Sequence, residues 1–239
     1  MSDESIRLSK RLTELGPYSR READELIEQG RVRVDGQVVD TLGSRVLPGQ
    51  RVEVLAAAAT VSASRVTLLF NKPAGLAEGE DGVAGWLKPA QRQAHGASDI
   101  LFLKRHLRHL QLATPMAAEA SGLVVLTQER RLVSKLQQSR DFEHEWLLWT
   151  DKPVDAAQLA RLNGVRSLDG VALRPFKLTQ QAERQLRLVL RETLPSGLAA
   201  LCAVAGIRLV RSQRIRVGQI AVTGLAPGQW RYLGLGERF

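Results

Sequence analysis

A run of small residues, Ala56-Ala57-Ala58-Ala59-Thr60-Val61-Ser62-Ala63-Ser64, interrupts the chain early in the sequence. It contains no large apolar side chain that could anchor a core, so it predicts a linker. The residues on its two sides are enough for two domains, each with a buried core of its own. We therefore predict a first domain at residues 1–57, a linker at 58–65 and a second domain at 66–239.

Charge is distributed unevenly over these two domains. The 239 residues carry 34 Lys and Arg against 25 Asp and Glu, which gives a formal net charge of +9 and an isoelectric point near 10.4. Residues 1–57 contain 9 basic and 10 acidic residues, so the rest of the chain carries a net charge of +10. Such an excess favours a polyanionic partner, nucleic acid before an anionic membrane.

The composition excludes several other classes of protein. Hydrophobic residues make up 44% and charged residues 25% of the chain, which excludes disordered, collagen-like and disulfide-rich proteins. The single cysteine, Cys202, cannot form an internal disulfide, and this fits a reducing compartment. The longest apolar run, Leu198–Ile207, is too short for a membrane span, and the acidic start of the chain does not have the pattern of a signal peptide. We expect a cytoplasmic protein that has no membrane segment.

The first domain has the pattern of two helices and a small sheet. Apolar residues at helical spacing predict a helix over residues 5–15. Ser19 is followed three positions later by Glu22, a capping box that predicts the start of a second helix, which ends at Gly30. Valines alternate on both sides of Asp35-Gly36 and predict a hairpin within a small meander.

Basic residues gather around these two helices although the domain as a whole is close to neutral. A helix start with neighbouring arginines suits a phosphate, and the alternative is a solvated surface paired with nearby carboxylates. Ser19-Arg20-Arg21-Glu22-Ala23, Leu26-Ile27 and Gly30–Gly36 together resemble the S4-like RNA-binding domain, over about residues 5–55. The resemblance implies that the domain holds structured RNA through its phosphates and shape. The residues expected to contact RNA here are Lys10, Arg11, Ser19, Arg20, Arg21, Arg31 and Arg33.

The second domain has the pattern of a mixed, mainly antiparallel sheet, which makes the whole chain α+β. A short helix is predicted over 82–87 and an apolar helix over Gly197–Val204. The predicted strands are Val66–Phe70, Gly122–Thr127, Trp146–Thr150, Leu186–Arg191 and Leu209–Val217.

Three stretches of this domain carry a family resemblance: Leu69–Gly75, Ser121–Thr127 and Gly224–Arg231. They resemble the opening strand and turn, the strand after the catalytic loop, and the C-terminal end of the RsuA-like ribosomal RNA pseudouridine synthases. An S4-like domain fused ahead of a pseudouridine synthase domain is the usual layout of that family. The resemblance implies structured RNA, above all ribosomal RNA, as the partner, with the target base flipped into a pocket. It also implies isomerisation of uridine without a metal or an organic cofactor. Further basic residues expected to contact RNA are Lys72, Lys104, Arg105 and Arg108.

The positions that the family uses for chemistry are altered in this chain. Its catalytic loop has the form Gly-Arg-Leu-Asp-x-Asp-Thr-Ser-Gly-Leu, and Ala117 falls at the essential aspartate when the loop is anchored on Gly122-Leu123. An alanine methyl can neither attack a ribose nor accept a proton. Trp146 falls at the family's tyrosine, and its indole N–H can only donate, so Trp146 either stacks on a base or packs in the core. The uncharged segment 193–201 replaces a basic helix start.

These changes favour an RNA-binding protein that has lost isomerase chemistry. The alternative is a working synthase that uses a displaced carboxylate, either Glu119 or Asp99. Glu119 is a poor substitute, because it lies roughly 6–7 Å further along an extended loop and small displacements are costly in catalysis. A third hypothesis is that the uncharged surface at 194–201 binds a protein partner.

Overall fold

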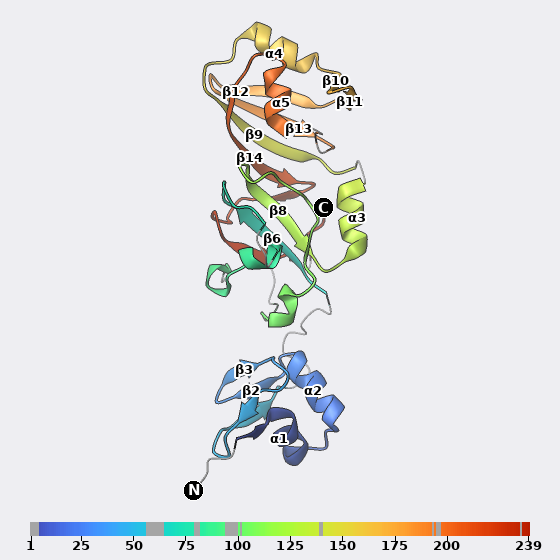
Figure 1. Cartoon of the computed structure of the whole chain (residues 1–239), viewed down its shortest axis with the longest axis vertical. Helices are drawn as coiled ribbons and strands as arrows, with labels where there is room; N and C mark the ends of the chain where they lie inside the picture. Colours follow the sequence, from blue (N-terminus) through green and yellow to red (C-terminus); the bar gives the residue numbers. More distant parts are fainter. Residues whose placement is uncertain are drawn as a thin grey trace. The chain divides into compact units, whose positions relative to one another are not determined.

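The structure is a computed structural model, and it divides into two compact units (Figure 1). One unit contains Met1–Val66 together with Asp99–His109, and the other contains Thr67–Ser98 and Leu110–Phe239. The predicted linker, apart from Arg65, lies outside the described residues. The residues that the structure describes are 5–55, 65–78, 82–93, 100, 102–138, 141–192, 194, 197–234 and 236–239.

The first unit contains the two helices and the small meander that its sequence predicts. Helix α2 begins with the predicted capping box, in which Ser19 and Glu22 exchange side-chain and backbone hydrogen bonds. Strands β3, β2 and β5 form an antiparallel sheet in that order, and β1 pairs with β4. The elements are β1 (Ile6–Arg7), α1 (Leu8–Leu15), α2 (Arg20–Glu28), β2 (Val32–Val34), β3 (Gln37–Val39), β4 (Arg45–Val46) and β5 (Val52–Val54).

The segment that returns to the first unit completes its packing. It contains the 3-10 turn η3 (Lys104–Leu107), and the preceding Leu103 is fully buried beside Gly30, at the end of α2. The Gly30 backbone has φ +65°, and a Cβ there would collide with the Leu103 side chain. The first unit therefore includes residues that a division into two continuous domains assigns to the second.

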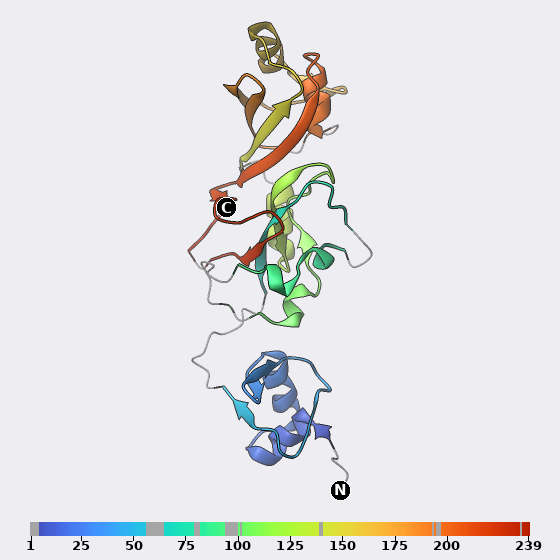
Figure 2. The same cartoon turned by 90° about the vertical axis from the view of Figure 1, so that its left-hand side faces the viewer.

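The second unit is built on one large sheet with the strand order β12-β13-β9-β14-β8-β6-β16. The pairs along this path are antiparallel except β14 with β8, and β14 joins the two halves of the sheet (Figure 2). The strands are β6 (Thr67–Lys72), β7 (Gln111–Leu112), β8 (Ser121–Thr127), β9 (His144–Thr150), β10 (Ser167–Leu168), β11 (Val171–Ala172), β12 (Lys177–Ala182), β13 (Gln185–Leu190), β14 (Leu209–Val217), β15 (Ile220–Ala221) and β16 (Trp230–Tyr232). The helices are η1 (Val83–Trp86), η2 (Pro89–Gln91), α3 (Arg130–Gln138), α4 (Ala156–Asn163) and α5 (Gly197–Ala203).

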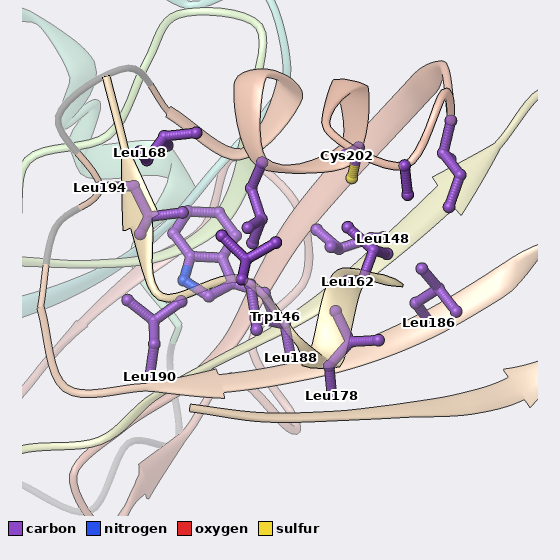
Figure 3. Close-up of a cluster of buried hydrophobic side chains, with 14 of the residues drawn as sticks. Trp146, Leu148, Leu162, Leu168, Leu178, Leu186, Leu188, Leu190, Leu194 and Cys202 are labelled. Atoms are coloured by element: carbon purple, nitrogen blue, oxygen red, sulfur yellow. The ribbon is translucent and has the colours of Figure 1, made fainter. Parts of the chain in front are cut away.

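Each half of this sheet packs on an apolar cluster of described residues. In the first, Trp146, Leu148 and Leu188 point from the sheet toward α4 and α5 (Figure 3). In the second, α3 packs through Leu136 on Leu123 and Val125 of β8. The alternation of inward and outward residues along β9 and β13 leaves the opposite face of these strands less buried.

The fold agrees with the α+β architecture expected from the sequence and adds elements that the patterns did not predict. Helix α4 and the β10–β11 hairpin were not expected, because short elements leave weak periodic signals. Within the described ranges, the structure contains no helix with the length and apolar character that a membrane crossing requires.

Candidate functional site

A cavity of about 520 Å³ lies against β9, β14 and the start of α5, next to the loop that precedes β8. This loop contains Ala117, so the position matched to the catalytic aspartate of the resembled family lies at a real pocket. The wall combines apolar side chains with a few charged ones, which is the usual chemistry of a small-molecule site. The residues that line the cavity include Ala117, Glu119, His144, Trp146, Glu192, Leu194, Leu198 and Arg214.

Lys72 supports the loop from one side. Its side chain is 1% exposed, and Nζ donates to the carbonyl oxygens of Ala118 at 2.8 Å and Ala120 at 2.7 Å. Burial lowers the pKa of its ammonium, while the charge of Glu119 opposes that shift. The expected contact between Lys72 and RNA therefore needs correction, because its ammonium faces backbone carbonyls inside the protein.

Arg214 supports the same loop from the other side. Its guanidinium donates to the carbonyl oxygens of Leu123, Thr114 and Pro115, at distances of 2.7, 2.7 and 3.2 Å. It also lies over the Trp146 ring, 5.2 Å from the ring centroid. Among the residues that the structure describes, no carboxylate forms an ion pair with Arg214. The arginine is thus a buried cation in the cavity wall whose partners are backbone carbonyls, the Thr114 hydroxyl at 3.0 Å and an aromatic ring.

Three carboxylates bear on the alternative catalytic hypothesis. Glu119 is exposed and lines the cavity together with Ala117. Glu192, which no motif in the sequence marks, also lines it and accepts a 2.7 Å hydrogen bond from the backbone N–H of Arg174. Asp99 lies outside the described residues. The cavity therefore contains carboxylates, although none at position 117.

Trp146 and His144 form the part of the wall that comes from β9. Trp146 is 8% exposed and packs among the leucines of the core (Figure 3). It also lines the cavity. The structure therefore shows core packing, and stacking of Trp146 on a base stays a prediction. Burial, reinforced by Arg214 and Arg216, lowers the pKa of His144 to about 3. Its imidazole is therefore neutral and offers hydrogen bonds without a charge.

The uncharged segment at 194–201 contributes to the cavity wall and to the core. Leu194 and Leu198 line the cavity, whereas Leu201 is fully buried. Residues 193, 195 and 196 lie outside the described part of the chain. Of the described part of the surface predicted for a protein partner, Leu194 and Leu201 are therefore buried, whereas Gly197 and Ala199 are exposed.

The first unit has a cationic cavity of its own, with a volume of about 420 Å³. Of the residues expected to bind RNA, Lys10 and Arg20 line it. Arg7 and Arg45 join them, and nothing in the sequence pattern separated these two from other surface arginines. Arg45 is held toward the cavity by hydrogen bonds to Ser5, with 3.0 Å between Nε and the Oγ. Four cations from four elements, β1, α1, α2 and β4, therefore converge on one hollow.

The other expected RNA contacts of the first unit are more dispersed. Arg11 pairs with Glu14 at 3.5 Å and Arg21 with Glu25 at 3.1 Å, and such exposed pairs are weak. Arg33 is exposed on β2.

Two further residues that were predicted to contact RNA make hydrogen bonds within the protein. Ser19 is the N-cap of α2, and Arg31 donates to the carbonyl of Leu55 at 3.1 Å.

The returning segment brings three more expected contacts to the first unit. The backbone N–H of Lys104 donates to the Asp40 carboxylate at 2.6 Å, and its ammonium lies 3.4 Å from the Thr41 hydroxyl. Lys104 and Arg108 are exposed, and Arg105 is partly exposed. These basic residues therefore add to the surface of the S4-like unit.

Comparisons with known proteins agree with this architecture. A family model described as S4 domain matches residues 6–52. The dual-specificity RNA pseudouridine synthase RluF of Escherichia coli K12 is 28% identical over 237 residues, covering 98% of this chain and 77% of that protein. An uncharacterized RNA pseudouridine synthase of Aquifex aeolicus is 27% identical over 232 residues, covering 95% and 92%. The crystal structure of a pseudouridylate synthase matches with a TM-score of 0.58, 19% identity and 96% coverage of both chains, which shows the same fold.

Proposed function

We propose, from the homology of this chain with RNA pseudouridine synthases of the RluF and RsuA type, that it binds structured RNA without isomerising uridine. The observation that carries the proposal is Ala117, which lies in the cavity wall where the family resemblance places the essential aspartate. The scaffold around it is intact, because Lys72 and Arg214 hold the loop by its carbonyl groups. A methyl group in that position supplies neither a nucleophile nor a base.

The cations of the first unit support the RNA-binding part of the proposal. Lys10, Arg20, Arg7 and Arg45 converge on a hollow that suits a phosphate, since guanidinium and ammonium groups donate to phosphate oxygens from several directions. Structured ribosomal RNA is the partner we propose, by analogy with the named relatives. A ribosomal partner implies a cytoplasmic location, in keeping with the single, buried Cys202.

A second candidate function rests on the two carboxylates of the cavity wall. Glu119 and Glu192 both line the cavity, so it contains carboxylates that a synthase with a displaced catalytic group could use. Glu119 is exposed to solvent and acts on Lys72 only through its charge, and Glu192 accepts the N–H of Arg174. We rank this candidate second because catalysis depends on the position of the carboxylate within about 1 Å.

Pseudouridine mapping on unmodified ribosomal RNA separates the two candidates. The purified chain, Glu119→Gln and Glu192→Gln are each incubated with the RNA, and pseudouridine is detected by carbodiimide labelling and primer extension. We expect no conversion by any of the three proteins. Site-specific conversion by the wild type that disappears in either variant would establish the second candidate instead.

RNA binding is measured separately with a stem-loop fragment of ribosomal RNA. Lys10→Glu and Arg20→Glu should each weaken binding about tenfold or more, and binding by the wild type should weaken steadily as salt rises. Arg161→Glu, on the exposed side of α4, is the matched control. Wild-type binding that is absent at low salt would refute the RNA-binding proposal.

A further inference from the structure

The face of the sheet that points away from the cavity is only partly buried over β12, β13, β9 and β14. On β13, Leu186, Leu188 and Leu190 are buried in the core, while Arg187 between them has a side chain that is 45% exposed. On β9, Trp146 and Leu148 point to the core, and Trp149 does not belong to it. The outward positions of these four strands thus form a surface of their own, which we call the outer sheet face.

Positive charge predominates on the outer sheet face. Within these four strands, its outward positions carry four cations and one carboxylate: Lys177, Arg187, Arg211, Arg216 and Glu145. The carboxylate is 5% exposed and is neutralised from both sides, by Arg187 at 2.6 Å and Arg216 at 2.7 Å. Lys177 and Arg211 are exposed, and they lie on the outer strands of the four. The surface therefore presents net positive charge to solvent.

An aromatic platform lies at one end of this surface. Trp149 on β9 pairs with Arg211 on β14, and the guanidinium carbon of Arg211 lies 4.3 Å from the centroid of the Trp149 ring. The Arg211 side chain is further held by a 3.1 Å hydrogen bond to Gln213. A planar cation supported on an indole offers its other side to a further flat group.

We propose that the outer sheet face binds a single-stranded segment of RNA. The proposal rests on the RNA-binding function proposed above and assigns a second contact region to the same partner. Unpaired bases stack on aromatic rings and on arginine planes exposed on a sheet, and their phosphates pair with cations nearby. Arg211 on Trp149 supplies the stacking platform, and Lys177 and Arg187 supply cations across the neighbouring strands. Half-buried Leu147 and Val189 supply apolar contact between them.

The outer sheet face meets the cavity at Arg211, which lines the cavity wall and also lies over Trp149. Successive residues of a strand point to opposite faces, and Trp146 lines the cavity whereas Trp149, three positions later, lies under Arg211. Lys177, Arg187 and Trp149 are not among the residues that line the cavity, so most of the outer face lies outside it. Lys177→Glu therefore tests the outer face alone, whereas Arg211→Glu also changes the cavity wall.

Binding to oligouridine of about twelve nucleotides tests the proposal. Fluorescence anisotropy at low salt should show that Arg211→Glu and Lys177→Glu each weaken binding of the oligouridine about tenfold or more. Arg161→Glu should stay within about twofold of the wild type, because Arg161 is an exposed arginine on α4. Oligouridine containing 4-thiouridine should photocrosslink to the peptide that contains Trp149. Trp149→Phe is the variant used at this position, because it keeps an aromatic ring where a smaller side chain would disturb the fold.

Binding of the ribosomal stem-loop RNA is measured in parallel. It distinguishes failure of the outer-face proposal from failure of the proposed RNA-binding function. Oligouridine binding that is absent, or equal in Lys177→Glu and Arg161→Glu, overturns the outer-face assignment. The proposed function still stands if the stem-loop binds and Lys10→Glu weakens it. Vesicles containing phosphatidylserine are the second probe. If they bind through Arg211 and oligouridine does not, the surface is a lipid site and the proposal is wrong.

Discussion

At the scale of single residues, two buried cations determine the shape of the loop that carries Ala117. Lys72 and Arg214 donate to carbonyl oxygens on either side of it, and neither presents its charge to solvent. A sequence pattern identifies such residues only as basic, because residue type does not distinguish a buried arginine or lysine from one on the surface. Burial is what changes their role from binding a partner to positioning a loop.

Replacing Lys72 by methionine should lower the free energy of unfolding by about 2–4 kcal/mol, because two buried carbonyl groups lose their donor. Urea denaturation followed by tryptophan fluorescence measures the change. Lys88→Met is the matched control, since Lys88 is exposed, and it should shift stability by less than about 0.5 kcal/mol. Equal stability of the two variants would contradict the assigned role of Lys72.

A second residue-scale prediction concerns acid stability. The hydrogen bond from Arg187, followed by that from Arg216, holds the pKa of Glu145 below its ordinary value despite burial. The stability that this carboxylate contributes is therefore present above its pKa in the unfolded chain and is lost as pH falls through its folded pKa. The wild type should lose stability below about pH 5, the onset of carboxylate protonation in the unfolded chain.

The control for this pH dependence is Glu145→Gln, which should be less stable at pH 7 by about 1–3 kcal/mol and lose less on acidification. Thermal melts at a series of pH values measure both effects. A pH profile for Glu145→Gln parallel to that of the wild type would show that another carboxylate is responsible.

At the scale of elements, the sequence predicts most of the regular structure around the site. The capping box at Ser19 and the strands at 121–127 and 209–217 follow from local patterns, and the structure contains each of them. The parallel pairing of β8 with β14 does not follow from any local pattern. This pairing joins segments separated by about ninety residues, and only packing of the two cores selects it.

Gly122 provides the test of that pairing. Its φ is +109°, and a Cβ there would collide with the backbone of Arg214, with 2.6 Å to the amide nitrogen. Gly122→Ala should therefore destabilise the second unit by about 3 kcal/mol or more. Gly170→Ala is matched in backbone conformation, with φ +78° and nothing within 4 Å, and should cost only about 1 kcal/mol. Denaturant titrations of the two variants would contradict this account if the costs were equal.

At the scale of the whole molecule, the first unit is assembled from two distant stretches of chain. Residues 1–57 alone carry 9 basic and 10 acidic residues, whereas Met1–Val66 with Asp99–His109 carry 13 basic and 11 acidic residues. The unit that contains the S4 domain is therefore net positive, and its charge suits RNA better than the continuous domain predicted from the sequence. The order of residues along the chain does not show this net charge, because the unit gains basic residues from a distant stretch of the chain.

Leu103 provides the whole-molecule prediction. It is fully buried beside Gly30, so Leu103→Ala should destabilise the first unit by about 2–4 kcal/mol. Hydrogen exchange followed by mass spectrometry should show faster exchange in α2 and unchanged exchange in β9. Leu42→Ala, at a leucine that is 47% exposed, should leave both unchanged. Faster exchange confined to the second unit would contradict the assignment of Leu103 to the first.

The sequence by itself determined the α+β class, the S4-like start of the chain and the absence of an aspartate at position 117, because these depend on local periodicity and on residue identity. The tertiary structure alone decided that Lys72 is buried, that Arg214 lies under the loop and that Glu192 joins the cavity wall. It also decided that Lys104 belongs with the first unit and that Trp149 supports Arg211 on the outer sheet face. Each of these depends on contacts between residues far apart in the chain, and burial and pairing at long range leave no periodic trace in the sequence.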